Sequence, residues 1–258
     1  MFDFLDIGLW HRLFPSIPEF ILMCVGVLLA GTIRSFTGFG AGLVLAPVLS
    51  LFMIPADMVV VLLLLNFLVS FQTLPGTWKT TNWKLVFSLT IPAMFGVPIG
   101  TWLVEWLDPG LIRRMLGVLV AGLAAIMLYG WRYKGGRGPI GDWIVGVSSG
   151  VLTSIAGVGG PPLVLYLLNA KDLTPVVLRS FFMMYFTLMQ IVTVAYFTYN
   201  DLINKSQILY TVSFLPVYVV STVLGTYLFT KALKKSADMI KRISLWFLLL
   251  VGLVTLAI

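Results

Sequence analysis

Hydrophobic residues in this chain fall into eight long runs that are separated by short polar stretches. The runs lie at about residues 18–54, 57–74, 84–105, 111–130, 142–170, 175–198, 207–230 and 240–258. An α-helix rises ~1.5 Å per residue and the hydrocarbon core of a bilayer is ~30 Å thick, so most runs are long enough to cross it once. The pattern predicts an all-α, polytopic membrane protein.

The composition of the chain agrees with this prediction. Of the 258 residues, 59% are hydrophobic and 10% are charged, whereas a soluble domain is near half apolar and about a quarter charged. These values exclude soluble, disordered and collagen-like chains. The net charge is +7, but there is no long run of Lys or Arg. We therefore expect a lipid bilayer, and no nucleic acid, as a partner.

Catalytic and metal-binding side chains are scarce within the hydrophobic runs. The chain has one cysteine, Cys24, and one histidine, His11, which excludes an internal disulfide, a thiol cluster and a site of several imidazoles. A membrane-embedded enzyme would need a nucleophile–base pair or metal ligands within the runs. We therefore expect neither an enzyme nor a cofactor.

Two of the hydrophobic runs have unusual lengths. The run at 142–170 has 29 residues and would be ~44 Å long as one helix, which is too long for one crossing and too short for two. The run at 18–54 has 37 residues, and glycines interrupt both runs. A helix that enters partway, breaks and returns to the same side fits these lengths. Each run is therefore predicted to form a glycine-broken re-entrant hairpin.

The two breaks repeat one motif at a constant offset of 119 residues. Gly100-Thr-Trp-Leu likewise resembles Gly225-Thr-Tyr-Leu. The chain is therefore predicted to be two related membrane repeats at 18–130 and 142–258, joined by a linker at 131–141, with an interfacial segment at 1–17. The shared positions of the motif are Gly31, Ser35, Gly38 and Gly40 in the first copy, and Gly150, Ser154, Gly157 and Gly159 in the second.

The distribution of Lys and Arg distinguishes two topologies. With both broken runs as hairpins, twelve basic residues lie on one side of the membrane, four on the other and Arg34 inside it. If each broken run crossed instead, the split would be nine against seven. Cytoplasmic loops collect Lys and Arg. We therefore expect two repeats of inverted topology, each a hairpin plus three transmembrane helices, with both termini outside and the linker in the cytoplasm.

The breaks are also predicted to form an anion site. A new helix begins after each break, at about Ala41 and at Pro161, and the free N–H groups and positive dipole end of a helix start attract anions. Arg34 lies in an apolar run with no central Asp or Glu to pair with it, which costs ~2.5 kcal/mol or more unless it faces a cavity. The predicted substrate-binding residues are Arg34, Ser35, Thr37, Gly38, Gly40, Gly42, Asn66, Thr153, Ser154, Gly157, Gly159, Gly160, Pro161, Arg179 and Gln190.

Each of these features also has a structural explanation. Paired glycines in membrane helices often serve helix packing, and Asn66 and Gln190 would serve equally as interhelical hydrogen bonds. Arg34 would snorkel to the interface if its helix began later. Arg179 at a helix end is an ordinary topology signal. Repetition of the whole motif, each copy beside prolines, favours the site.

The sequence resembles the TauE/SafE sulfite-exporter-like permeases. The resemblance rests on Arg34-Ser-Phe-Thr-Gly-Phe-Gly-Ala-Gly with Ala46-Pro47, and on Gly150 to Pro162 followed by Leu163-Val-Leu-Tyr. It implies export of sulfite or a small organosulfonate such as sulfoacetate across the bacterial inner membrane. Two departures, Ala41 in place of a glycine and Pro161-Pro162, bear on the identity of the substrate more than on the fold.

Without the family resemblance, the residues indicate a carrier or channel for a small anion that is held near the middle of the membrane. Two alternatives stay open. One is an exporter or channel for another small organic anion such as a carboxylate, and the other is a membrane scaffold without transport. Lipid-exposed glycine and aromatic faces would also allow a homodimer.

Overall fold

The computed structural model describes residues 16–108, ten positions between 110 and 129, residues 137–167 and residues 173–232. Residues 1–15 of the predicted interfacial segment, much of the run at 111–130, linker residues 131–136 and the run at 240–258 lie outside the described residues. The elements are α2 (Ile17–Thr37), α3 (Ala41–Ser50), α4 (Pro55–Thr77), the 3₁₀ turn η1 (Trp78–Thr80), α5 (Trp83–Trp106), α7 (Pro139–Ala156), α8 (Gly160–Leu167), α9 (Pro175–Tyr199) and α10 (Lys205–Ala232).

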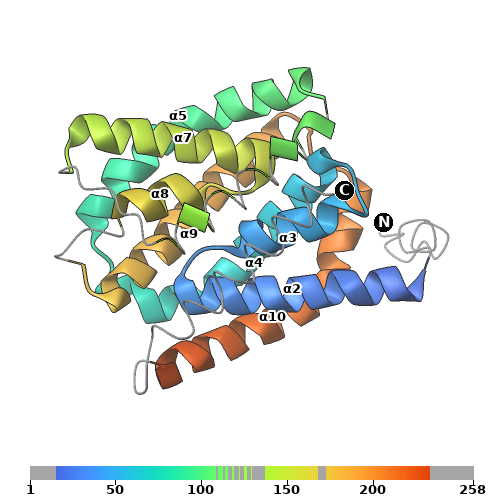
Figure 1. The fold of residues 1–258 in the computed structure, drawn as a ribbon, viewed down its shortest axis with the longest axis horizontal. Helices are drawn as coiled ribbons and strands as arrows, with labels where there is room; N and C mark the ends of the chain where they lie inside the picture. Colours follow the sequence, from blue (N-terminus) through green and yellow to red (C-terminus); the bar gives the residue numbers. More distant parts are fainter. Residues whose placement is uncertain are drawn as a thin grey trace.

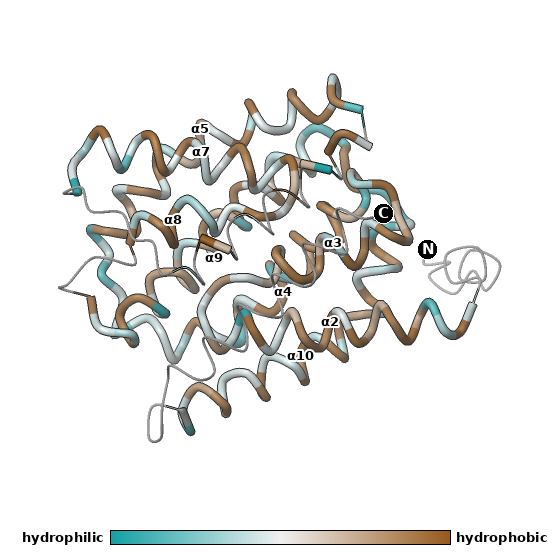
Figure 2. The backbone as a smooth tube through the Cα atoms, viewed as in Figure 1, coloured by the Kyte–Doolittle hydropathy of each residue, from teal (hydrophilic) through white to brown (hydrophobic). Residues whose placement is uncertain are grey.

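Every element in this part of the chain is helical, as predicted. Five of the helices, α2, α4, α5, α9 and α10, are long and apolar enough to cross a membrane. Hydrophobic residues extend along most of their length (Figure 2). The all-α, multi-pass membrane fold is therefore confirmed.

The first predicted break lies between α2 and α3. Ser16 caps the start of α2 by accepting a hydrogen bond from the Glu19 N–H. Gly38 and Gly40 take left-handed φ angles of +88° and +94°, which glycine adopts without strain. After Gly40 the chain reverses, and α3 runs back beside α2 (Figure 1). The new helix begins at Ala41, as predicted.

The second break has the same form. Helix α7 ends at Ala156 and is capped by Gly157, whose φ angle is +67°, and α8 then runs back beside α7 (Figure 1). Helix α8 begins at Gly160, one residue before the predicted start at Pro161. Helix α7 begins at Pro139, so the last three residues of the predicted linker are already helical.

The two halves pack in corresponding ways. Helix α2 packs against α10 of the second half, α7 packs against α5 of the first half, and α4 and α9 meet between them. Helices α2 and α7 start from opposite ends of the molecule (Figure 1). This arrangement supports two repeats of inverted topology. The repeats, the re-entrant hairpins and the side of the membrane that each loop faces stay predictions.

Glycines hold the two helix pairs close together. A Cβ added at Gly225 of α10 would lie 2.8 Å from the Cβ of Ser35 in α2. A Cβ added at Gly100 of α5 would lie 2.9 Å from the Cβ of Ser154 in α7. These glycines serve helix packing, as one of the two explanations of the motif predicted. Packing of the same kind at the same motif positions places both breaks at the centre of the fold.

Candidate functional site

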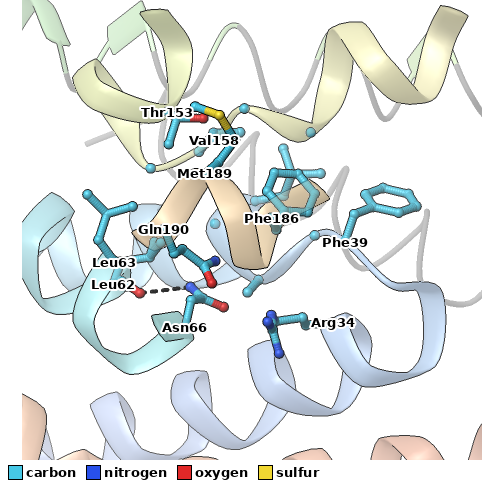
Figure 3. Close-up of a pocket in the computed structure, with 17 residues that line it drawn as sticks. Arg34, Phe39, Leu62, Leu63, Asn66, Thr153, Val158, Phe186, Met189 and Gln190 are labelled. Atoms are coloured by element: carbon cyan, nitrogen blue, oxygen red, sulfur yellow. Dashed lines mark hydrogen bonds between the residues drawn. The ribbon is translucent and has the colours of Figure 1, made fainter. Parts of the chain in front are cut away.

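The two helix breaks are in contact. Gly42, in the first turn of α3, lies so close to the second break that an added Cβ would overlap the carbonyl group of Gly157. Between the breaks is a cavity of about 30 Å³ (Figure 3), with room for about two water molecules. Its lining comes from both halves of the chain: Arg34, Phe39, Gly40, Ala41, Gly42, Leu43, Leu62, Leu63, Asn66, Thr153, Gly157, Val158, Gly159, Gly160, Phe186, Met189 and Gln190.

Arg34 supplies the positive charge of this cavity. It lies in the last turn of α2 and is only 2% exposed, so it does not snorkel. Its Nη2 donates to the hydroxyl of Ser70 at 2.8 Å, but its Nη1 is buried with no hydrogen-bond partner. No lining residue of the cavity is acidic. An unpaired buried guanidinium nitrogen is costly, so the cavity offers a donor for an acceptor that the protein itself does not supply.

Ser70 of α4 orients the Arg34 side chain. The Ser70 hydroxyl donates its one proton to the Asn66 carbonyl oxygen at 2.6 Å, so it accepts from both other neighbours. The amide group of Gln190 therefore faces Ser70 with its nitrogen, at 2.7 Å. In this orientation the same nitrogen also lies within hydrogen-bond distance of the carbonyl oxygens of Phe186 and Asn66, at 3.2 and 3.1 Å, which share its second proton. The network joins α2, α4 and α9 at one wall of the cavity.

Asn66 connects this wall of the cavity to α10 by a hydrogen bond. Its Nδ2 donates to the Leu62 carbonyl oxygen at 2.8 Å, and its Oδ1 accepts from the Tyr218 hydroxyl at 2.7 Å. Asn66 and Gln190 therefore line the cavity and also make hydrogen bonds between helices. The interhelical hydrogen bonds expected of these two amides are present, whereas their contact with a substrate stays a prediction.

The start of α3 adds free backbone donors to the cavity. No side chain caps this start, and Gly40 and the first three residues of α3 all line the cavity. The first N–H groups of an α-helix have no partner within the helix. The start of α8 offers fewer donors, because Pro161 and Pro162 have no N–H. The two helix starts, which the sequence suggested as equivalent, are therefore unequal.

Short polar side chains fix the backbone of each break. The Thr37 hydroxyl donates to the Phe39 carbonyl oxygen at 2.6 Å, inside the first break. At the second break, the Ser149 hydroxyl donates to the Gly159 carbonyl oxygen at 2.5 Å and accepts from the Tyr185 hydroxyl at 2.8 Å. Backbone groups that a helix break frees in an apolar environment need such partners. The breaks are thus defined structures of the fold.

The structure brings together nine of the fifteen predicted site residues. The remaining six lie beside the cavity. Thr37 fixes the first break, Gly38 packs against the backbone of Arg179, and Pro161 follows Gly160 in the first turn of α8. The nine that line the cavity are Arg34, Gly40, Gly42, Asn66, Thr153, Gly157, Gly159, Gly160 and Gln190. Their contact with a substrate stays a prediction.

Ser35, Ser154 and Arg179 have other surroundings. Ser35 and Ser154 face the glycines of α10 and α5 and not the cavity, and both hydroxyls are buried without a hydrogen-bond partner. Arg179 of α9 donates from Nε and Nη2 to the Ser35 carbonyl oxygen, at 2.8 and 2.6 Å. Arg179 therefore binds the end of α2 from outside the cavity.

Sequence reasoning missed the apolar part of the lining and the residue that orients Arg34. An apolar side chain inside a hydrophobic run carries no signal that separates a cavity wall from a packed core. Ser70 gave no signal either, because a single hydroxyl in a membrane helix commonly bonds its own backbone. The missed lining residues are Phe39, Ala41, Leu43, Leu62, Leu63, Val158, Phe186 and Met189.

Comparison with known families identifies the chain. The sequence profile of the family described as "Sulfite exporter TauE/SafE" matches residues 23–255, which include both breaks and every lining residue of the cavity. The chain belongs to the TauE/SafE family. This is a family of exporters and not of enzymes, so the chain is a membrane transporter, and the resemblance given by the two motifs is confirmed.

One curated TauE/SafE protein extends the comparison. The "Probable sulfite/organosulfonate exporter TauE" of Cupriavidus necator is 28% identical to this chain over 219 residues, which are 80% of this chain and 84% of that protein. No solved structure matches the chain at a significant level.

Proposed function

We propose that this TauE/SafE protein exports a small sulfur-containing oxyanion, sulfite or an organosulfonate such as sulfoacetate, across the bacterial inner membrane. The observation that carries the proposal is the Nη1 atom of Arg34, which is buried beside the start of α3 without a partner. An oxyanion would accept hydrogen bonds from this atom and from the free N–H groups of α3. The Cupriavidus relative is named as a sulfite/organosulfonate exporter, which favours a sulfur anion over a carboxylate.

The position of the cavity supports transport. Both halves of the chain line it, and transporters built from inverted repeats bind their substrates at the interface of the repeats, near the middle of the membrane. At about 30 Å³ the cavity is too small for a whole organosulfonate. We therefore infer that the cavity widens during transport and that the structure is a closed state of a carrier.

Thermal stabilisation of the purified full-length protein tests this proposal. An anion that binds only the folded state stabilises it by about 2.7 kcal/mol at a concentration one hundred times its Kd. We expect sulfite or isethionate to raise the melting temperature of the wild type and of Lys205→Gln, a control that removes an exposed cation at the far end of α10. Arg34→Gln should remain folded and show no increase.

Other outcomes separate the alternatives. Stabilisation by acetate and not by sulfonates would favour a carboxylate exporter. An absence of stabilisation by any anion, with all three proteins folded and monodisperse, would overturn the proposal and favour a scaffold in which the breaks serve packing alone.

A further inference from the structure

A second, larger chamber lies at the end of the molecule where α4 and α10 end and α9 begins. Its volume of about 380 Å³ is more than ten times that of the cavity beside Arg34 and falls in the range of pockets that hold small organic ligands. Arg179 is the one charged residue of its lining. The other polar groups come from Gln72, Thr73, Thr77, Thr226 and Thr230.

A track of polar side chains connects the chamber to the central cavity. Along α4, Asn66, Ser70, Thr73 and Thr77 follow one another at spacings of three or four residues and so share one face of the helix. Asn66 belongs to the central cavity, and the two threonines belong to the chamber. Ser70, which binds Arg34, lies between them.

The facing side of α10 carries a matching track. Its members, Tyr218, Thr222, Thr226 and Thr230, recur every four residues. One hydrogen bond joins the two tracks, from the Tyr218 hydroxyl to Asn66 at 2.7 Å, and the Thr222 hydroxyl reaches α4 at Gln72 Oε1, beside the track, at 2.9 Å. Most hydroxyls of these tracks also donate to carbonyl oxygens of their own helix, so they are satisfied in the bundle and offer their oxygen lone pairs to the route.

Arg179 lies beside the polar side chains of α10 and contacts the end of α2. Its guanidinium binds the Ser35 carbonyl oxygen, lies 3.5 Å from the Thr226 hydroxyl through Nη2, and stacks over the Phe229 ring at 4.3 Å. No acidic residue lines the chamber to neutralise it. Because Ser35 directly follows Arg34, a ligand on Arg179 would act on the helix turn that carries the central cation.

Three positions of this route have apolar counterparts at the other end of the molecule, whereas Thr73 and Thr226 have polar ones, Thr193 and Thr101. Helices α4 and α9 begin at Pro55 and Pro175, 120 residues apart, which matches Arg179 with Val59 and Thr77 with Phe197. The Gly100 and Gly225 motifs, 125 residues apart, match Thr222 with Val97. All three apolar partners are buried. A charged side chain at the Arg179 position and a hydroxyl at the Thr77 and Thr222 positions are therefore present at one end alone among these matched pairs.

Basic residues gather at the chamber end. Lys79 and Lys84 lie where α4 leads into α5, and Lys231 lies in the last turn of α10. The opposite end has one described lysine, Lys205 at the start of α10, together with Asp57 at the start of α4 and Asp201 after α9. Lys and Arg concentrate on the cytoplasmic side of membrane proteins, which predicts that the chamber end faces the cytoplasm.

We propose that this chamber is a second anion site, in which a small organosulfonate from the cytoplasm binds to Arg179 before it reaches Arg34. The inference rests on the proposed function, because it places a site on the path of the same anion. The sulfonate group would take the Arg179 guanidinium and the threonine hydroxyls. The organic part would lie against Val223 and Tyr227 of α10, which also line the chamber.

Thiol labelling of the full-length protein in nanodiscs tests the chamber by itself. Cys24 is the one cysteine of the chain, so Cys24→Ser gives a thiol-free background for Thr226→Cys. The matched control is Thr101→Cys, the corresponding position on α5, which is buried at the opposite end. Sulfonatoethyl methanethiosulfonate is the probe, because it is itself an organosulfonate and forms a mixed disulfide with the new thiol.

We expect the probe to modify Thr226→Cys at least about tenfold faster than Thr101→Cys, because the charge of Arg179 concentrates anions in the chamber. Isethionate should slow this reaction, whereas potassium chloride and propionate at equal ionic strength should not. Adding Arg179→Gln should remove the advantage of the anionic probe over its cationic trimethylammonioethyl analogue. Thr230→Cys, on the same track, gives the same measurement if Thr226→Cys does not fold.

Equal labelling at both ends, or no protection by isethionate, would overturn the second site. Protection by propionate as well would overturn its selectivity for sulfonates. The same measurements on Arg34→Gln separate this inference from the proposed function. If only the central site is wrong, labelling and protection persist while Arg34→Gln leaves thermal stabilisation unchanged. If only the chamber is wrong, protection is absent while Arg34-dependent stabilisation remains.

Discussion

The two terminal nitrogens of the Arg34 guanidinium differ, because one is fixed by a hydrogen bond and the other has no partner. Its Nη2 is held by Ser70, whose own proton is committed to the Asn66 carbonyl oxygen, so Ser70 acts only as an acceptor toward the guanidinium. The Nη1 atom has no such partner, and the Arg34 residue lines the cavity. The direction of the free donor is therefore set by a serine that does not line the cavity.

Ser70→Ala tests this positioning role. The substitution removes the acceptor of Nη2 and the donor to Asn66, so we expect a loss of about 1–3 kcal/mol of folding stability. Without its anchor the guanidinium can turn away from the cavity, and we expect the Kd for the anion to rise about tenfold. Titration of the melting temperature with anion measures both effects. Ser88→Ala on α5, where the hydroxyl bonds only its own helix, should change neither. An unchanged Kd in Ser70→Ala would remove the positioning role.

The sequence allowed Arg34 to be predicted as a site residue because an unpaired charge in an apolar run is rare and costly. The glycines at 40, 157 and 159 were predicted as site residues because the motif occurs twice. Phe39, Phe186 and Met189 could not be found, since cavity-lining and core residues have the same chemistry. The contacts of Arg179 could not be predicted from the sequence, because its partners Ser35 and Thr226 come from helices distant in sequence.

Among the elements, each broken helix depends on a helix of the other half. Helix α2 lies on α10 through Gly225, and α7 lies on α5 through Gly100. The cavity residue Arg34 directly precedes Ser35, which packs on Gly225, and Thr153 directly precedes Ser154, which packs on Gly100. The spacing of these helix pairs therefore sets the position of both cavity walls.

Gly225→Ala is expected to force α2 and α10 apart. An added Cβ would overlap the Thr32 carbonyl oxygen and approach the Cβ of Ser35 to 2.8 Å. Overpacking of this kind costs about 1–3 kcal/mol, so the melting temperature should fall, and anion binding should weaken because Arg34 moves with Ser35. Gly76→Ala in α4 is the control for stability, since no atom lies within 4 Å of its added Cβ. Equal melting temperatures for the two variants would contradict a packing role for Gly225.

The elements themselves were largely predictable, and their pairing was not. Run length and glycine position located both breaks, because only a helix with an interruption fits 29 or 37 apolar residues. Proline favours the first turn of a helix without specifying its first residue, so the start of α8 differed by one position from the prediction. The chamber could not be predicted from the sequence, since the threonines of α4 and α10 line one cavity only when the two helices face each other.

At the scale of the whole molecule, two cavities of very different size lie along one polar route. The chamber beside Arg179 has a volume of about 380 Å³, whereas the cavity beside Arg34 has a volume of about 30 Å³. Direct contact between Gly42 and Gly157 closes the breaks against each other. Passage of an anion therefore requires the two breaks to separate, which favours a carrier over an open channel.

Separation of the breaks needs an energy source, and the distribution of charge indicates which one. The described carboxylates lie at helix ends, and neither cavity has an acidic lining residue that would carry a proton. Export of an anion from a cell with a negative interior is favoured by about 2.3 kcal/mol per charge at 100 mV. We therefore expect export to be driven by voltage alone. Counterflow of labelled isethionate in proteoliposomes, under a potassium diffusion potential, measures this dependence.

Asp142 supplies the critical control for this prediction, because it is a buried carboxylate of the described chain and accepts a hydrogen bond from the Tyr166 hydroxyl at 2.8 Å. If a proton moved with the anion, Asp142 would be its most favourable carrier. We expect Asp142→Asn to keep the voltage dependence of the wild type, and a pH gradient without voltage to drive no accumulation. Transport that requires a pH gradient, ignores voltage and is lost in Asp142→Asn would replace voltage-driven export with proton coupling through the first turn of α7.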